Sequence, residues 1–129
     1  MTHPNVDGIR RVFDAFGGGD KRALFEVIAA DAVWEVPGTT PVSRVYEGRD
    51  AIFGLFQETR RLTDGSYLSR LQWALADDVH AVAVYRASGA RGERRLDIDQ
   101  VLTIDLVDGR WQRVVALPTD PAAFAAFWA

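Results

Sequence analysis

The spacing of apolar residues changes along the chain from a helical period to a strand period. In the first half, apolar side chains recur every three or four residues in three segments, which predicts amphipathic helices. The predicted helices are residues 5–17, 20–28 and 48–62. Between the second and the third, residues 32–36 predict a short strand that Pro-Gly ends, followed by a loop over residues 37–47.

Beyond residue 65 the apolar positions alternate with polar ones, which predicts strands separated by short turns. The predicted strands are residues 66–76, 79–88, 94–107 and 110–117. Asp120 followed by a proline predicts the start of a short last helix. This order favours an α+β fold in which helices cover one face of a mainly antiparallel sheet. Residues 1–129 contain no linker or repeat, so we expect a single domain.

The composition excludes several classes of protein and several kinds of functional site. Seven Phe, four Trp and three Tyr are too many for a disordered chain. The absence of Cys excludes disulfide frameworks, thiolate metal sites and cysteine nucleophiles. A net charge of −3 argues against a nucleic-acid partner. No apolar run reaches the roughly 20 residues of a membrane helix, and the first residues lack a secretory pattern. We therefore expect a cytoplasmic protein without a membrane partner.

Several local strings, taken in order, carry a family resemblance. They are Gly19-Asp20, the segments 31–38 and 46–52, Asp108-Gly109-Arg110, and the segment 120–128. Together they resemble the nuclear-transport-factor-2-like superfamily, and its SnoaL-like branch in particular. The resemblance implies a cone, in which a strongly curved sheet wraps around three helices and a pocket opens at the wide end. The superfamily includes ketosteroid isomerase, limonene-epoxide hydrolase, polyketide cyclases and non-catalytic binding or dimerisation modules, so the fold does not fix the function.

The isomerase pattern of the superfamily is incomplete in this chain. It requires a carboxylate base, a Tyr and a protonated carboxylic acid around the substrate carbonyl. By the resemblance, the base position falls on Val36 and the Tyr position on or near Val12, and neither side chain can exchange a proton. The acid position falls on Asp99. One of the three parts is therefore present. Glu35, beside Val36, would replace the base only through a local bulge.

The epoxide hydrolase and cyclase patterns are incomplete as well. Arg86 falls near the hydrolase arginine, but Ser88 stands where that pattern has an Asp. The distal carboxylate, and the acid of the polyketide cyclases, would fall near Val115 or Ala116. None of these three patterns is therefore complete in this chain.

One polar group remains as the candidate catalytic set: Asp97, Asp99 and Arg86. The two aspartates share a strand face, and a hairpin between residues 79–88 and 94–107 would place Arg86 across from one of them. In a pocket, burial and like charge would raise the pKa of one Asp while Arg86 keeps the other ionised. His3 and His80 are too far apart in sequence to suggest a metal site, so we expect no metal and no cofactor.

The orientation of this strand has two interpretations. Plain alternation places Leu102 and Ile104 in the core and Asp99 in water. The resemblance instead places the Asp99 face inside the cone. Both patterns can hold if the Leu and Ile side chains cover a second subunit. We therefore expect either a homodimer that buries Leu102 and Ile104 at the outer sheet face, or an exposed Asp99 without a role.

Aromatic and apolar residues are expected to line the pocket for a small apolar molecule. The candidate ligand-binding residues are Trp34, Val36, Tyr46, Phe53, Phe56, Trp73, Val84 and Val101, and Tyr67 is placed there too. Core packing accounts for most aromatic residues, so only two or three are expected to line the cavity itself. Two functions stay open: an isomerase- or cyclase-type acid–base enzyme acting on an apolar carbonyl compound, and a non-catalytic ligand-binding or dimerisation module with a degenerate active site.

Overall fold

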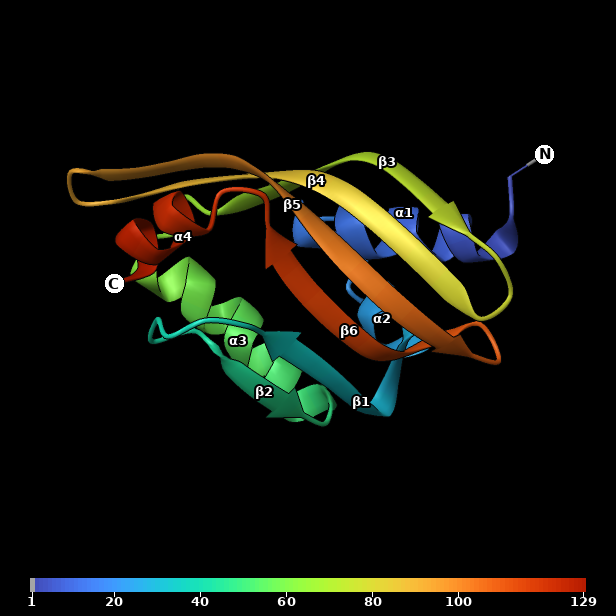
Figure 1. The fold of residues 1–129 in the computed structure, drawn as a ribbon. Helices are drawn as coiled ribbons and strands as arrows, with labels where there is room; N and C mark the ends of the chain where they lie inside the picture. Colours follow the sequence, from blue (N-terminus) through green and yellow to red (C-terminus); the bar gives the residue numbers. More distant parts are fainter. Residues whose placement is uncertain (1) are drawn as a thin grey trace.

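The computed structural model describes residues 2–129, which form four helices and six strands (Figure 1). The helices are α1 (Pro4–Phe16), α2 (Arg22–Val27), α3 (Arg49–Leu62) and α4 (Pro121–Trp128). The strands are β1 (Ile28–Val36), β2 (Arg44–Glu47), β3 (Leu68–Ala76), β4 (His80–Arg91), β5 (Arg94–Val107) and β6 (Arg110–Pro118).

All six strands belong to one sheet with the order β2-β1-β6-β5-β4-β3. Strands β1 and β6 run parallel, and every other neighbouring pair is antiparallel. The sheet curves around the helices, with α1 beside β3, α3 beside β1, and α4 at one end of β5 (Figure 1). The predicted α+β class, with a mainly antiparallel curved sheet and a short last helix, is confirmed.

Alternation along β5 decides which side of the sheet forms the core. Leu102 and Ile104 are 1% and 2% exposed and face the helices, whereas the alternating residues Thr103 and Asp105 are exposed. The hydrophobic effect therefore orients the strand by its Leu and Ile side chains, because each buried side chain of this size contributes about 1.5–3 kcal/mol. The concave side of the sheet is apolar and the outer side carries the aspartates.

Two local signals place the helix ends. Asp120 accepts a hydrogen bond from the backbone N–H of Ala123 at 3.0 Å, and Pro121 occupies the first turn of α4, as predicted. At the start of α1, the Nδ1 atom of His3 accepts from the N–H of Asn5 at 3.1 Å. No helix within residues 2–129 combines the length and the apolar character needed to cross a membrane.

The region between the second and third helices differs from the prediction. Strand β2 lies inside the predicted loop 37–47 and pairs with β1, so that Tyr46 lies opposite Trp34. Its four residues are too few for alternation to identify a strand. Strand β1 begins at Ile28, which the apolar spacing had assigned to the preceding helix.

Strand β3 contains a bulge that changes the direction of its side chains. Leu71 lies opposite Tyr85 and Trp73 lies opposite Val84, so Gln72 is an extra residue in the pairing. Directly opposed residues of an antiparallel pair share a face of the sheet. Because a bulge shifts the alternation by one residue, Trp73 joins the outer face although Leu71 faces inward.

Candidate ligand-binding site

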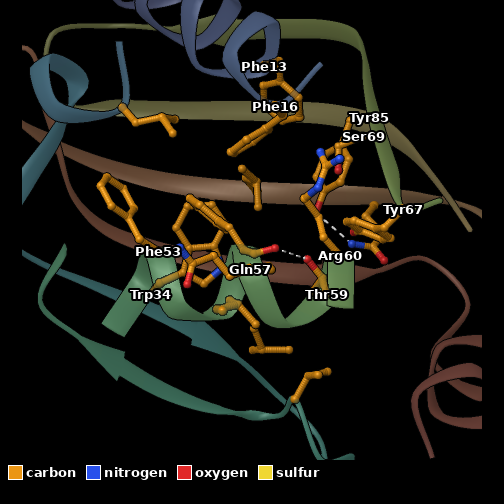
Figure 2. A pocket seen from close by; sticks show the side chains of 18 of the residues that line it. Phe13, Phe16, Trp34, Phe53, Gln57, Thr59, Arg60, Tyr67, Ser69 and Tyr85 are labelled. Atoms are coloured by element: carbon orange, nitrogen blue, oxygen red, sulfur yellow. Dashed lines mark hydrogen bonds between the residues drawn. The ribbon is translucent and has the colours of Figure 1, made fainter. Parts of the chain in front are cut away.

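A cavity of about 370 Å³ lies on the concave side of the sheet, between the helices and the strands (Figure 2). Ten aromatic side chains line it, which corrects the expectation that only two or three would do so. They come from α1, α2, α3, the central strands and α4. The larger number follows from the fold, because the sheet and all four helices converge on the same space.

Phe56 on α3 is the centre of the aromatic wall. Its ring lies edge-to-face against Trp34 and Phe16, with centroid distances of 5.2 and 5.0 Å, and 6.1 Å from the ring of Phe53. Such contacts fix ring orientation beyond what burial alone requires. The wall is therefore pre-formed, with flat apolar surfaces suited to a ring-containing molecule.

The other end of the cavity is polar. Tyr67, Ser69, Tyr85 and Gln100 line it, and Figure 2 shows the first three on the side opposite Trp34 and Phe53. The Nε2 atom of Gln100 donates a hydrogen bond to the hydroxyl of Tyr85 at 2.7 Å. Gln100 is only 3% exposed, and its Oε1 atom has no hydrogen-bond partner within residues 2–129.

The tyrosines at this end are uncharged. Burial raises the pKa of Tyr85 well above the ordinary value of 10.0, and the neighbouring Tyr67 raises it further. Burial also raises the pKa of Tyr67, against the opposing effect of hydrogen bonds with Ser69 and Gln100. Both hydroxyls therefore keep their protons at neutral pH and act as neutral donors and acceptors.

Two cations lie at the edge of the cavity. The Nζ atom of Lys21 donates to the carbonyl of Ala15, which ties it to the end of α1. Arg60 extends from α3 on the side of the tyrosines (Figure 2). Among the described residues, the lining includes no Asp, Glu or His.

Several of the predicted ligand-binding residues do line the cavity: Trp34, Val36, Phe53, Phe56 and also Tyr67. Tyr46 does not. Its hydroxyl donates to the carbonyl of Val42 at 2.7 Å, and Arg44 lies over its ring. Burial raises the pKa of Tyr46 as well. The short strand β2 thus directs this ring to its own loop instead of the cavity.

Trp73, Val84 and Val101 were wrongly placed in the cavity. All three lie on the outer face of the sheet, where Trp73 is 50% exposed and its neighbours Val84 and Val101 are half-buried. The bulge in β3 turns Trp73 outward, and the direct pairing of Val84 with Trp73 and Val101 keeps all three on one face.

The candidate catalytic group Asp97, Asp99 and Arg86 forms as predicted, but outside the cavity. Arg86 lies opposite Asp99 in the β4–β5 hairpin. Its Nε donates to Asp97 at 2.7 Å and its Nη1 to Asp99 at 3.2 Å, while Gln72 donates to Asp99 at 3.0 Å. The expectation that this face points into the cone is wrong, because the Leu and Ile face of β5 occupies the concave side.

The charge state of this group also differs from the prediction. The hydrogen bond from Arg86 lowers the pKa of Asp97 below its ordinary value of 3.8. The two carboxylates raise the pKa of Arg86 in turn. A raised Asp pKa, which acid catalysis would require, was expected for a buried pair, and this pair is exposed to water.

Leu102 and Ile104 were expected at a subunit interface on the outer face, and this placement is wrong. Both are buried within the single chain, and Leu102 lines the cavity. The outer face instead presents two rows across the strands that are apolar except for Thr103. The first row is Trp73, Val84, Val101 and Leu117, and the second is Leu75, Val82, Thr103 and Val115.

Sequence reasoning missed Gln100 and Tyr85. Gln100 has the same parity along β5 as Leu102 and Ile98, so plain alternation already placed it inside. A polar residue in the middle of an inward apolar series was the signal that could have identified it. Tyr85 lies directly opposite Gln100, and a hairpin register would have paired them.

Comparisons with known proteins agree with this architecture. A family model described as a SnoaL-like domain matches residues 9–114. An uncharacterised protein of Mycobacterium tuberculosis is 32% identical over 126 residues, which cover 97% of this chain and 96% of that protein. Bal32a, from a soil-derived mobile gene cassette, superposes with a TM-score of 0.92 at 29% identity, covering 98% of this chain and 97% of its own.

More distant solved structures share the fold. IdmH from Streptomyces antibioticus, a candidate polyketide cyclase, superposes with a TM-score of 0.76 at 21% identity and covers 95% of this chain and 97% of its own. Other neighbours have the cystatin-like or nuclear-transport-factor-2-like fold. The resemblance noted in the sequence is thereby confirmed. With the family model matching most of the chain, the protein belongs to the SnoaL-like domain family.

Proposed function

We propose that the protein binds a small, ring-containing apolar molecule in its aromatic cavity. One observation carries the proposal: a pre-formed aromatic wall around Phe56 faces the buried hydrogen-bonded pair of Tyr85 and Gln100 across one cavity. An apolar pocket with a few convergent polar groups is the usual form of a small-molecule site. The wall would hold the rings, and the polar end would orient a carbonyl or hydroxyl oxygen.

The lining favours binding over acid–base catalysis. A base for proton abstraction must lie within hydrogen-bond reach of the substrate, and the described lining offers no carboxylate or imidazole. An isomerase or cyclase reaction would have as proton donors the tyrosine hydroxyls and Lys21, whose ammonium group already donates to the carbonyl of Ala15. The non-catalytic alternative, a family fold with a degenerate active site, therefore fits the residues better. Apolar carbonyl compounds remain the ligand class of this proposal, because the hydroxyls at the polar end of the cavity can donate to a carbonyl oxygen.

A ligand screen with a cavity-filling variant tests the proposal. Trp34 and Trp128 line the cavity, so binding of naphthols, naphthoquinones and anthraquinones should change the tryptophan fluorescence. Ala116→Leu adds side-chain volume inside the cavity and should weaken binding at least ~10-fold, since overpacked sites cannot also hold a ligand. Ala51→Leu on the exposed side of α3 is the matched control. If no compound binds, or Ala116→Leu leaves every affinity unchanged, the proposal is wrong.

We also propose that the outer sheet face packs against a second copy of the chain. The rows around Trp73 and Val84 expose apolar surface across four strands, which is typical of an interaction surface. The adjoining carboxylates of Asp97 and Asp99 lie near Arg86 and Arg70, so this group has no excess charge that would repel a second copy. Light scattering at about 100 μM should give a dimer that Trp73→Glu converts to monomer. A monomeric wild-type protein would exclude this interface.

A further inference from the structure

The charges around the aromatic cavity are all of one sign. Lys21 and Arg60 line it, and the described residues contribute no carboxylate there. The chain as a whole carries the opposite balance, with 18 acidic and 15 basic side chains. A cavity edge with only cations in an acidic protein favours negatively charged ligands, because the low-dielectric wall reduces screening of the field inside.

Arg60 is the cation available to such a ligand. Lys21 already donates to the carbonyl of Ala15, and the adjacent Arg61 is paired with Glu58 at 2.5 Å. The guanidinium of Arg60 has neither an ion pair nor a hydrogen bond within residues 2–129. A guanidinium presents donors in a planar fork that matches a carboxylate, and its position at the cavity edge leaves that fork open.

The polar end of the cavity adds neutral donors on the same side. Figure 2 places Arg60 beside Tyr67, Ser69 and Tyr85. Trp34 and Phe53, which belong to the aromatic wall around Phe56, lie on the other side. The tyrosine hydroxyls stay protonated because of their burial, so they add no negative charge. An acidic oxygen that enters here meets hydrogen-bond donors from the strands and a cation from α3, while the rings behind it contact the aromatic wall.

We infer that Arg60 makes the cavity selective for apolar acids, meaning ring compounds that carry a carboxylate or another ionised oxygen at one end. This inference rests on the proposed binding function and specifies its ligand class. The apolar wall supplies contact area that neutral and acidic compounds share. Arg60 distinguishes between them, because only the ionised group gains a charge-assisted hydrogen bond.

Matched pairs of ring compounds test the inference. Benzoate, 2-naphthoate and anthracene-2-carboxylate are compared with their carboxamides, which keep the shape and lose the charge. Affinities for the whole protein are measured at pH 7.5 by calorimetry or tryptophan fluorescence. We expect at least one carboxylate to bind ~10-fold or more tightly than its amide, with a preference that shrinks in high salt because the cavity edge is exposed to ions.

Substitutions on α3 assign the preference to one side chain. Arg60→Gln should remove the preference, so that each carboxylate and its amide bind with equal affinity. Arg60→Lys should keep part of it, since the charge remains and the planar fork is lost. Arg61→Gln, at the next position of α3 and outside the cavity lining, should change neither affinity.

Each outcome is decisive. Equal binding of acid and amide by the wild-type protein, or a preference that survives Arg60→Gln, overturns the role of Arg60 while the binding function stands, provided that Ala116→Leu weakens the amide. If no compound of either series binds, the binding function fails and the acid selectivity fails with it.

Discussion

Gln100 on β5 lies directly opposite Tyr85 on β4 and donates a hydrogen bond to its hydroxyl at 2.7 Å. The pair is buried at the polar end of the aromatic cavity, and Gln100 Oε1 has no protein partner within residues 2–129. Most buried polar atoms in protein structures have a hydrogen-bond partner. The unpaired Oε1 atom beside the cavity is therefore a hydrogen-bond acceptor that is available to a bound molecule.

The first prediction concerns the stability of this pair. Tyr85→Phe should destabilise the protein by about 1–3 kcal/mol, because it leaves the buried amide of Gln100 without its partner hydroxyl. Gln100→Leu in the same background removes the stranded amide, so the double variant should be more stable than the sum of the single effects. Urea unfolding of the four proteins measures the coupling. Strict additivity would show that the hydrogen bond contributes nothing.

The second prediction concerns alkaline pH. The pKa of Tyr85 lies well above 10.0 in the folded protein and near 10.0 in the unfolded chain. Above pH 10 the unfolded state therefore loses this proton first, so the free energy of unfolding should fall as the pH rises. Tyr85→Phe should make this fall shallower between pH 10 and 11.5. Absorbance at 295 nm should show phenolate forming later than in a free tyrosine, and normal ionisation of all three tyrosines would contradict the burial.

The third prediction separates the two faces of the sheet. Leu102→Ala should destabilise the protein by about 2–5 kcal/mol, because Leu102 is buried inside the chain. Leu117→Ala, at a side chain that is 40% exposed on the outer face, should cost far less. Thermal or urea unfolding of both variants at micromolar concentration gives the comparison. If both variants lost the same small amount of stability, Leu102 would not be a core residue, and the interface position first expected for it would stand.

The fourth prediction concerns the outer ion pairs. Because Arg86 lowers the pKa of Asp97, the contribution of this carboxylate to stability is present above pH 3.8 and is lost as the pH falls through the lowered value. Asp97→Asn should therefore lower the stability slightly at pH 7, with a difference that disappears in acid. Ligand affinity should not change, because Asp97 lies outside the cavity. A loss of binding in this variant would restore a functional role.

Strong periodicity made most of the fold predictable. Strand β5 was predicted with its observed limits of 94–107, because fourteen residues of regular alternation leave little ambiguity. Strand β2 was missed because four residues between a proline loop and Gly48 carry no readable period. The orientation of β5 followed from alternation alone, and the placement of Asp99 inside the cone by family resemblance was the error.

The candidate site was predictable only in part. Trp34, Val36, Phe53 and Phe56 were correctly placed at the cavity because they lie on the apolar faces of their elements. Trp73 was wrong because a bulge is a property of strand pairing and leaves no mark in the apolar pattern. Arg60 was not singled out, since the role of an exposed helical arginine depends on what lies beside it in space.

The cavity draws its walls from both ends of the chain. Phe13 in α1 and Trp128 in α4 line the same space, and β1 pairs in parallel with β6. A chain emerging from the ribosome thus carries Tyr85 and Gln100 before Ala116, Phe124 and Trp128, which complete the cavity wall, have been made. Ligand cannot assist folding during synthesis until β6 and α4 have been released, because loop closure over most of the chain must come first. Ligand-dependent stabilisation is therefore expected only after translation has passed Trp128.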